Sequence, residues 1–390
     1  MNALMLLIGG NPLPNYVTAR YLLEQGRPDS KYIPAPGRFF LVYSEKTRPF
    51  KERLVSCLGI TGTRDVHLGS DELDFAHVKR RIAGVLEKEN TLTTVHLNYT
   101  GGTKSMVLAA YEAVSERGYA RIFSYLDPSN FKLVTSEEQM FPVQDDLRQH
   151  VCPSMEDIFS IHCLEEPSYR TAITSEFHEL SQAPDFYDLL LSREFSSRLE
   201  EYEKIRLGGN TREKDKKRFF SNPPNAEEFL DLMKNTGFLI DENRHTAFEV
   251  YRLLSSSWLE QRVFSSLFVI GESLHVSGMV WNVEVGKGKG NFEIDVIAFR
   301  GYQPIVFSCT TSVGKGMIKQ KAFEVNYRSV QLGGDHAKGV VVCLGKGTTC
   351  EEVRHDMKQF DAAGNFSIIG IEELGEEEKL VRSLRRILQD

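Results

Sequence analysis

The chain has 390 residues, of which 41% are hydrophobic and 26% are charged, and its formal net charge at pH 7 is −7. This composition is typical of a folded globular protein, and at roughly 150 residues per domain the length predicts two or three domains. The negative charge excludes nucleic-acid binding through the overall field, so any such contact requires a local basic surface. No apolar stretch reaches the ~18 residues of a membrane-spanning helix, so no membrane partner is expected.

The cysteines and the N-terminus indicate a cytoplasmic protein. Six cysteines are scattered along the chain without CxxC spacing, which favours reduced thiols and argues against a zinc site. The apolar run at residues 3–8 lacks the basic residues of a secretion signal, so it is interpreted as a first strand.

Residues 1–145 alternate between strand-like and helix-like runs. The strand-like runs are residues 3–8, 39–44, 66–68, 94–99 and 120–126, and most of the intervening segments have helical character. This alternation predicts an α/β fold with a Rossmann-like, doubly wound parallel sheet. In such sheets ligands bind at the loops that leave the carboxyl ends of the strands.

Three of these loops are unusual in composition. They are GGNPLPN (residues 9–15), SEKTRP (residues 44–49) and TGGTK (residues 100–104). Each could instead be an ordinary turn or a solvated loop. A dinucleotide cofactor is a further alternative, but the first loop lacks GxGxxG and Ser44 stands where an acidic residue would close the second strand.

The loop at residues 100–104 has the features of an anion site. Gly101 and Gly102 permit positive φ and leave space for a ligand. Thr100 or Thr103 can cap the following helix, whose N-terminal N–H groups favour a phosphate. Lys104 adds a positive charge at the same place.

The motifs IGGNPLPN, YSEKT and LNYTGGTKSM resemble the CRISPR-associated Rossmann-fold (CARF) domain, the cyclic-oligoadenylate sensor of type III CRISPR immunity. The resemblance implies that cyclic oligoadenylate is the activator, with cyclic tetra-adenylate the expected ring. Because such a ring has two-fold symmetry, a homodimer is expected. The implied ring contacts are Gly10, Asn11, Pro12, Leu13, Pro14, Ser44, Thr47, Thr100, Gly101, Gly102, Thr103 and Lys104.

Residues 146–235 are predicted to be a linker followed by a helical and basic connecting region. A helix is expected at residues 186–205. Residues 207–225 are interpreted as a basic loop that carries Phe219 and Phe220. A solvated loop is the favoured interpretation, and a surface that meets a nucleic-acid backbone and stacks a base is the alternative.

Residues 236–390 are predicted to form a second α/β domain. A helix at residues 245–268 carries Glu260, and strands follow at residues 276–286, 292–301 and 303–311, with a Gly/Lys turn at 286–291. This pattern resembles the restriction-endonuclease-like PD-(D/E)xK nuclease core. Glu260 and Asp295 are then the expected ligands of Mg²⁺ or Mn²⁺, because these ions prefer oxygen ligands.

The third of these strands departs from the nuclease pattern. Ser308, Cys309 and Thr310 stand where the family has Glu-x-Lys. In one account Lys315 or Lys319 replaces the lysine, Ser308 assists the metal and the site is catalytic. In the other account the core is degenerate and structural.

The sequence therefore predicts a cyclic-oligoadenylate-activated, metal-dependent endonuclease that cleaves DNA or RNA in type III CRISPR antiviral defence. Glu260, Asp295, Ser308, Thr310 and either Lys315 or Lys319 are the candidate catalytic residues. A cyclic-oligoadenylate sensor with a non-catalytic nuclease domain is the alternative, and a dinucleotide-dependent enzyme is a more distant one.

Overall fold

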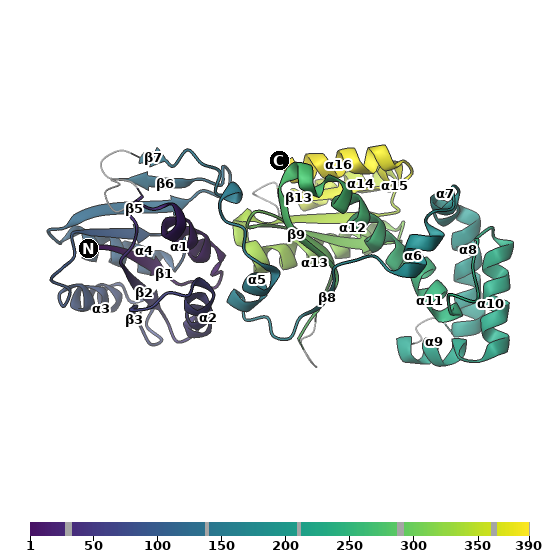
Figure 1. Cartoon of the computed structure of the whole chain (residues 1–390), viewed down its shortest axis with the longest axis horizontal. Helices are drawn as coiled ribbons and strands as arrows, with labels where there is room; N and C mark the ends of the chain where they lie inside the picture. Colours follow the sequence, from purple (N-terminus) through teal and green to yellow (C-terminus); the bar gives the residue numbers. More distant parts are fainter. Residues whose placement is uncertain (28–32, 137–139, 209–211, 287–291, 360–364, 390) are drawn as a thin grey trace.

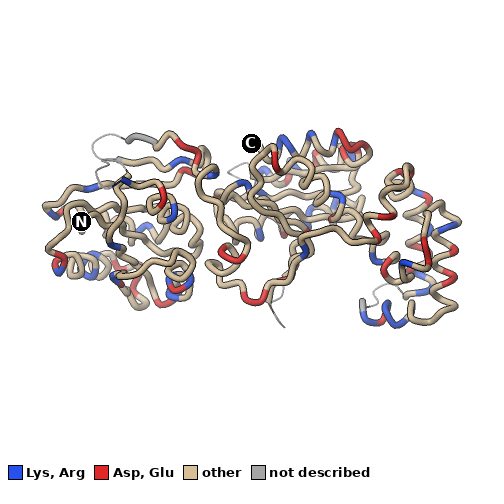
Figure 2. The backbone as a smooth tube through the Cα atoms, viewed as in Figure 1, with Lys and Arg blue, Asp and Glu red and all other residues tan. Residues whose placement is uncertain are grey.

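The computed structural model describes residues 1–27, 33–136, 140–208, 212–286, 292–359 and 365–389. Three parts follow one another along the long axis of the molecule (Figure 1): an N-terminal sheet with its helices, a second sheet, and a helical unit at the far end. Lys and Arg are interspersed with Asp and Glu over all three parts (Figure 2).

The N-terminal part confirms the predicted doubly wound sheet. In the described residues its strand order is β3-β2-β1-β4-β5-β6-β7, and β1 to β5 are parallel. The strands are β1 (Asn2–Leu7), β2 (Arg38–Tyr43), β3 (Arg64–His67), β4 (Thr94–Asn98), β5 (Ala120–Leu126), β6 (Leu133–Ser136) and β7 (Met140–Pro142). The strand order reverses between β1 and β4, which is where ligands of such sheets bind.

Helices cover both faces of this sheet. They are α1 (Leu13–Gln25), α2 (Arg48–Leu58), α3 (Phe75–Leu86) and α4 (Lys104–Ser115). Strand β1 is apolar from Ala3 onward because both of its faces are buried: Leu4 and Leu6 join the core under α1 and α2, whereas Met5 and Leu7 join the core under α3 and α4.

The second sheet has the order β13-β12-β11-β10-β9-β8. Its strands are β8 (Ser168–Arg170), β9 (Val276–Val285), β10 (Phe292–Arg300), β11 (Gln303–Thr310), β12 (Lys338–Cys343) and β13 (Phe366–Ile369). Its helices are α5 (Met155–Ile161), α12 (Trp258–Gly271), α13 (Lys315–Gly333), α14 (Gly347–Met357), α15 (Ile371–Leu374) and α16 (Glu377–Gln389). This part is the predicted second α/β domain, and the predicted turn at 286–291 lies largely outside the described residues.

The helical unit corrects the prediction of a basic loop at residues 207–225. Its helices are α6 (Ser175–Leu180), α7 (Phe186–Leu191), α8 (Arg193–Tyr202), α9 (Glu213–Phe220), α10 (Pro223–Asn235) and α11 (Ala247–Arg252). Outside the undescribed residues 209–211, most of the predicted loop is helix. Phe220 is buried between Phe229 and Tyr251, so it is not available to stack a base.

The predicted division at residues 145 and 235 stays a prediction, and the structure adds a detail to it. Strand β8 comes from the segment interpreted as linker, yet it pairs antiparallel with β9 at the edge of the second sheet. The connecting region is therefore part of the second sheet before it enters the helical unit.

Arg148 joins the two sheets. Its guanidinium lies 3.7 Å from the ring centroid of Phe131, which follows β5, and its Nη1 donates to Gln303 Oε1 of β11 at 2.8 Å. Its Nε and Nη2 donate to Asp146 at 2.8–3.1 Å. Gly301 has φ +59, and a Cβ there would lie 2.1 Å from the Arg148 carbonyl oxygen, so the close approach requires glycine.

We expect Arg148→Ala to lower the free energy of unfolding by ~3–5 kcal/mol, because it breaks a buried ion pair and leaves Gln303 without its donor. Thermal unfolding of the full chain measures the effect. Arg198→Ala is the control, because Arg198 pairs with Glu194 on the exposed surface of α8 and should cost less than ~1 kcal/mol. Equal losses from the two variants would contradict the role of Arg148.

Candidate functional site

A cavity of about 230 Å³ opens where the strand order of the first sheet reverses. The loops after β1 and β4 form one side of it, and a turn of the second domain forms the other. The lining residues are Gly9, Gly10, Asn11, Pro14, Thr100, Gly101, Gly102, Tyr125, Pro128, Gly334, Asp335 and His336. Six of the predicted ring contacts are therefore brought together here.

Glycines allow the two loops to approach each other. A Cβ at Gly101 would lie 2.3 Å from the Leu7 carbonyl oxygen, and Gly102 has φ +80. Side chains at these two positions would clash with the backbone or strain it. Gly10 differs, because a Cβ there would meet nothing within 4 Å. Gly10 therefore leaves open the space that a ligand would occupy.

The other predicted ring contacts do not line this cavity. Pro12 and Leu13 are buried at the start of α1. Ser44 is only 3% exposed, and its backbone N–H donates to Thr47 Oγ1 at 3.0 Å. The loop at residues 44–49 is therefore closed on itself.

Thr103 and Lys104 form the beginning of α4. The Met106 N–H donates to Thr103 Oγ1 at 3.2 Å, which confirms a threonine cap. Thr100 has another role, because its Oγ1 accepts from the Leu126 N–H at 2.7 Å. Lys104 is exposed beside the loop and does not line the cavity.

The sequence interpretation missed the residues that the second domain contributes. Gly334, Asp335 and His336 follow α13 and lie more than 200 positions beyond the loops that they face. Burial lowers the pKa of His336 to about 4, so its imidazole is neutral at pH 7. No local sequence signal marks this turn, because only the packing of the domains brings it to the cavity.

A second site forms where β10 and β11 separate. Their pairing runs as far as Val296 opposite Phe307. Beyond that point the Cys309 N–H donates to Asp295 Oδ2 at 2.5 Å, and Ser308 Oγ donates to the same oxygen at 3.2 Å. The carboxylate of Asp295 is thus held in place by the strand where the Glu-x-Lys motif was expected.

Glu260 of α12 interacts electrostatically with Asp295. Burial raises the pKa of Glu260 to about 8, and the negative charges of Asp295 and Glu293 add to the increase. Burial also raises the pKa of Asp295, against the effect of the Cys309 N–H. Half-buried carboxylates that repel each other favour a cation between them.

The oxygen donors at this site suit a hard divalent cation. Two carboxylates and the Ser308 hydroxyl are groups that Mg²⁺ and Mn²⁺ accept, with water completing the coordination. Among the described residues no group of three or more His, Cys, Asp or Glu side chains is arranged to hold a metal ion. The donor set therefore fits an ion held by two side chains.

The lysine whose charge acts on Asp295 and Glu260 is Lys321, whereas the predicted Lys315 and Lys319 form ion pairs with carboxylates of α14. Lys315 Nζ lies 2.9 Å from Glu352 Oε2, and Lys319 Nζ lies 3.0 Å from Asp356 Oδ2. Glu352 and Asp356 are both on α14. The two lysines lie one helical turn apart and share a face.

Lys321 lies two residues beyond Lys319, about 200° around α13, and so faces β10. Burial alone would lower its pKa, but the charges of Asp295, Glu324 and Glu293 raise it. Lys321, Glu324 and Arg328 recur at helical spacing, and this period was the signal that could have identified the face.

The hydroxyl of Thr310 and the thiol of Cys309, both on β11, have structural roles and are not placed to react. Thr310 Oγ1 accepts from the Ser312 N–H at 3.2 Å, which shapes the turn into α13. Burial raises the pKa of the Cys309 thiol well above its usual value, so the thiol is neutral and unsuited to act as a nucleophile.

No protein-family model and no curated protein sequence matches the chain. Protein VC1899 from Vibrio cholerae shares its fold, with 15% identity, a TM-score of 0.64, and coverage of 99% of this chain and 98% of that one. Can2 from Sulfobacillus thermosulfidooxidans, solved in complex with cyclic tetra-adenylate, gives 15% identity and a TM-score of 0.64 over 100% and 99% of the two chains. The predicted fold of two α/β domains is thereby confirmed.

The described helices include none that combines the length and apolar character needed to cross a bilayer.

The raised pKa of Glu260 predicts a pH-dependent stability of the metal-free protein. The folded state holds this proton up to about pH 8, whereas the unfolded chain releases it near 4.5, so stability falls as the pH rises between these values. We expect Glu260→Gln to match the parent at pH 4.5 and to exceed it at pH 8.5 by on the order of 1–3 kcal/mol. Melting curves of both proteins in EDTA at the two pH values measure this effect. If the variant and the parent differed in stability by the same amount at both pH values, the raised pKa of Glu260 would be contradicted.

Proposed function

We propose that the protein is a cyclic-oligoadenylate-activated, divalent-metal-dependent nuclease of type III CRISPR defence. Its substrate is the phosphodiester backbone of DNA or RNA, and its location is the cytoplasm. The observation that carries the proposal is the half-buried pair Glu260 and Asp295, on which the charge of Lys321 acts, in a chain that also has a cavity at the switch point of a CARF-like sheet.

The activator site is the cavity between the loops after β1 and β4. Its position and the N-terminus of α4 beside it suit a phosphate-containing ligand. Its volume of about 230 Å³ is below the ~300–1,000 Å³ of ordinary small-molecule sites, so one chain supplies only part of the cradle for a ring. This supports a homodimer with one ring between two matching cavities. Can2 was solved in complex with cyclic tetra-adenylate, so this ring is the first to test.

The carboxylates of Glu260 and Asp295 would hold Mn²⁺ or Mg²⁺. When bound, such an ion lowers the pKa of a coordinated water and offsets the charge of the phosphate. Ser308 Oγ and the Cys309 N–H fix the orientation of Asp295 through its Oδ2. The ammonium of Lys321 stabilises the negative charge that develops on the phosphate, which is the role of the missing family lysine.

A non-catalytic sensor is the second candidate, because Ser308, Cys309 and Thr310 replace the family motif. The placement of Lys321 weakens it, since the charge of the lost lysine is supplied from α13. Cleavage assays of the parent protein on DNA and RNA, with Mn²⁺ and with or without cyclic tetra-adenylate, distinguish the two functions.

Gly10→Leu tests the activator site. The leucine should fold into open space and fill the cavity, so we expect cyclic tetra-adenylate to bind at least ~100-fold more weakly, with the melting temperature unchanged. Gly118→Leu is the matched control, because a Cβ there also meets nothing within 4 Å and the residue does not line the cavity.

Calorimetry measures affinity and stoichiometry together, and one ring per two chains is the expected ratio. Normal binding by Gly10→Leu would refute the site. One ring per chain would refute the shared cradle.

Lys321→Ala tests the catalytic site. We expect it to slow activated cleavage by ~10²-fold or more, as does the loss of one transition-state donor, whereas Lys319→Ala on the same helix should cut at nearly the parent rate. Asp295→Asn should reduce cleavage to background while ring binding persists. If Lys319→Ala were the slower of the two lysine variants, the assignment of Lys321 would be wrong.

A further inference from the structure

A cleft of about 380 Å³ lies between the second sheet and the helical unit, next to the carboxylates. Glu260 and Glu293 form its end at the metal site. Arg170 of β8, Lys216 of α9 and Arg252 of α11 also line it. The cleft therefore connects the proposed catalytic centre to residues that the nuclease core itself does not supply.

Arg170 and Arg252 are half-buried cations without a carboxylate partner in the described part of the chain. No carboxylate oxygen there lies within ion-pairing distance of either side chain. Arg244 and Arg206 of the same region, by contrast, pair with Glu179 and Glu228. Partial burial of an unpaired charge is costly, so such residues are expected to meet an external anion.

The third cation is held by a polar chain. Lys216 Nζ donates to the Tyr251 hydroxyl at 2.7 Å, and that hydroxyl donates to Glu203 Oε1 at 2.6 Å. Because Tyr251 is buried, this chain fixes the ammonium at the wall of the cleft.

Trp281 orients Arg170. The guanidinium lies 5.3 Å from the indole centroid, and the indole Nε1 donates to the Ala172 carbonyl at 2.9 Å. Trp281 is only 2% exposed, so its ring supports the arginine and is not open to a nucleobase. The cleft thus presents charge for a backbone and no exposed indole for a base.

A π-helical turn, Leu253–Ser257, links Arg252 to α12. The hydroxyls of Ser255, Ser256 and Ser257 all donate to the Arg252 carbonyl at 3.4–3.5 Å. The turn places Arg252 close enough to Glu260 for its charge to oppose the raised pKa of that carboxyl. Turns of this kind occur often at functional sites.

We propose that this cleft binds the sugar-phosphate backbone of the nucleic-acid substrate, with Arg170 and Arg252 contacting phosphates next to the scissile one. This inference rests on the proposed nuclease function. The helical unit then has a defined role, since Lys216 and Arg252 make it one wall of the substrate site. The lining carboxylates Glu284 and Glu293 lie on β9 and β10, so the phosphates follow the side formed by β8 and the helical unit.

Binding of a short fluorescein-labelled oligonucleotide, single-stranded and duplex, tests the proposal in the full chain with cyclic tetra-adenylate present. The Asp295→Asn background prevents cleavage during the measurement. We expect Arg170→Ala combined with Arg252→Ala to raise Kd ~10-fold or more. The slope of log Kd against log [NaCl] should fall by about 0.7–0.9 for each arginine removed, which a merely structural change would not produce.

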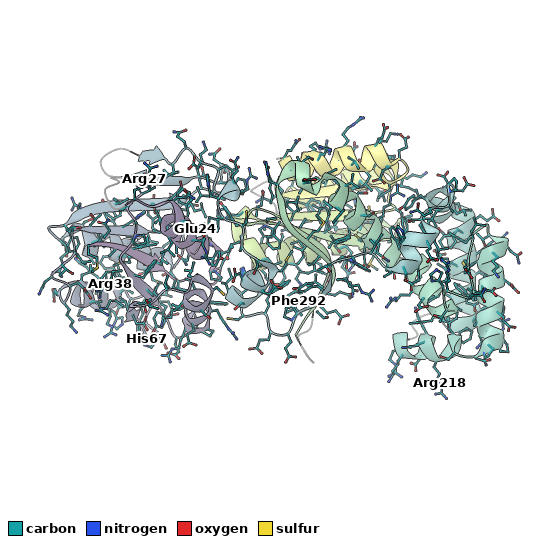
Figure 3. The ribbon with its side chains drawn as sticks, in the orientation of Figure 1. Glu24, Arg27, Arg38, His67, Arg218 and Phe292 are labelled. Carbon is teal, nitrogen blue, oxygen red and sulfur yellow. The ribbon has the colours of Figure 1, made fainter. Side chains whose placement is uncertain are left out.

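Arg218→Ala is the matched control. Arg218 lies on α9 as Lys216 does, but it is exposed at the outer edge of the helical unit (Figure 3) and does not line the cleft. It should leave both Kd and the salt slope unchanged. Arg170→Lys with Arg252→Lys should keep the parent slope, because the charges remain.

The outcomes separate this inference from the proposed function. If the parent cleaves when activated but the double alanine variant keeps its affinity and salt slope, the cleft assignment is wrong and the nuclease stands. If the double alanine variant binds more weakly and with a smaller salt slope, while the parent binds nucleic acid without cleaving it, the cleft is supported and the catalytic role fails. A parent that neither binds nor cleaves nucleic acid overturns both.

Discussion

The arrangement of the two α/β parts depends on one buried guanidinium. Arg148 contacts Phe131 of the first part and Gln303 of the second, and Asp146 neutralises its charge. Gly301 is needed because the chain passes against the Arg148 carbonyl. A buried charge with donors to both sides restricts the arrangement more than apolar contact would, because any slippage leaves donors unpaired. The cavity between the parts exists only while this joint holds.

Helix α13 is common to both sites. Lys321, on its β10-facing side, interacts with Asp295, and its end leads into the turn at Gly334, where a Cβ would lie 2.5 Å from Asn11 Nδ2. Between these points the Arg328 guanidinium lies 4.2 Å from the ring centroid of Phe292, and both residues line a cavity together with Asn11 of the first part. A rigid helix of 19 residues therefore connects the cavity at the first sheet with the carboxylates of the second.

The carboxylate site combines destabilising and functional features. Glu260 and Asp295 are half-buried and interact electrostatically, and their raised pKa values reflect the free energy required to ionise both. Nearby cations reduce this cost: Lys321 acts on both carboxyls and Arg252 acts on Glu260. Such an arrangement has little value for stability alone, whereas it suits a site that binds a divalent ion and a phosphate.

The sequence by itself determined the two α/β folds, the loops at residues 9–15 and 100–104, and the acids Glu260 and Asp295. These follow from local periodicity and from glycines at strand ends, which neighbouring residues specify. Tertiary structure alone decided that the charge of Lys321 acts on Asp295, that His336 reaches the first cavity and that Phe220 is buried. Each depends on which face of a helix meets a distant strand or domain, and the spacing of residues along a chain does not encode that choice until the elements pack.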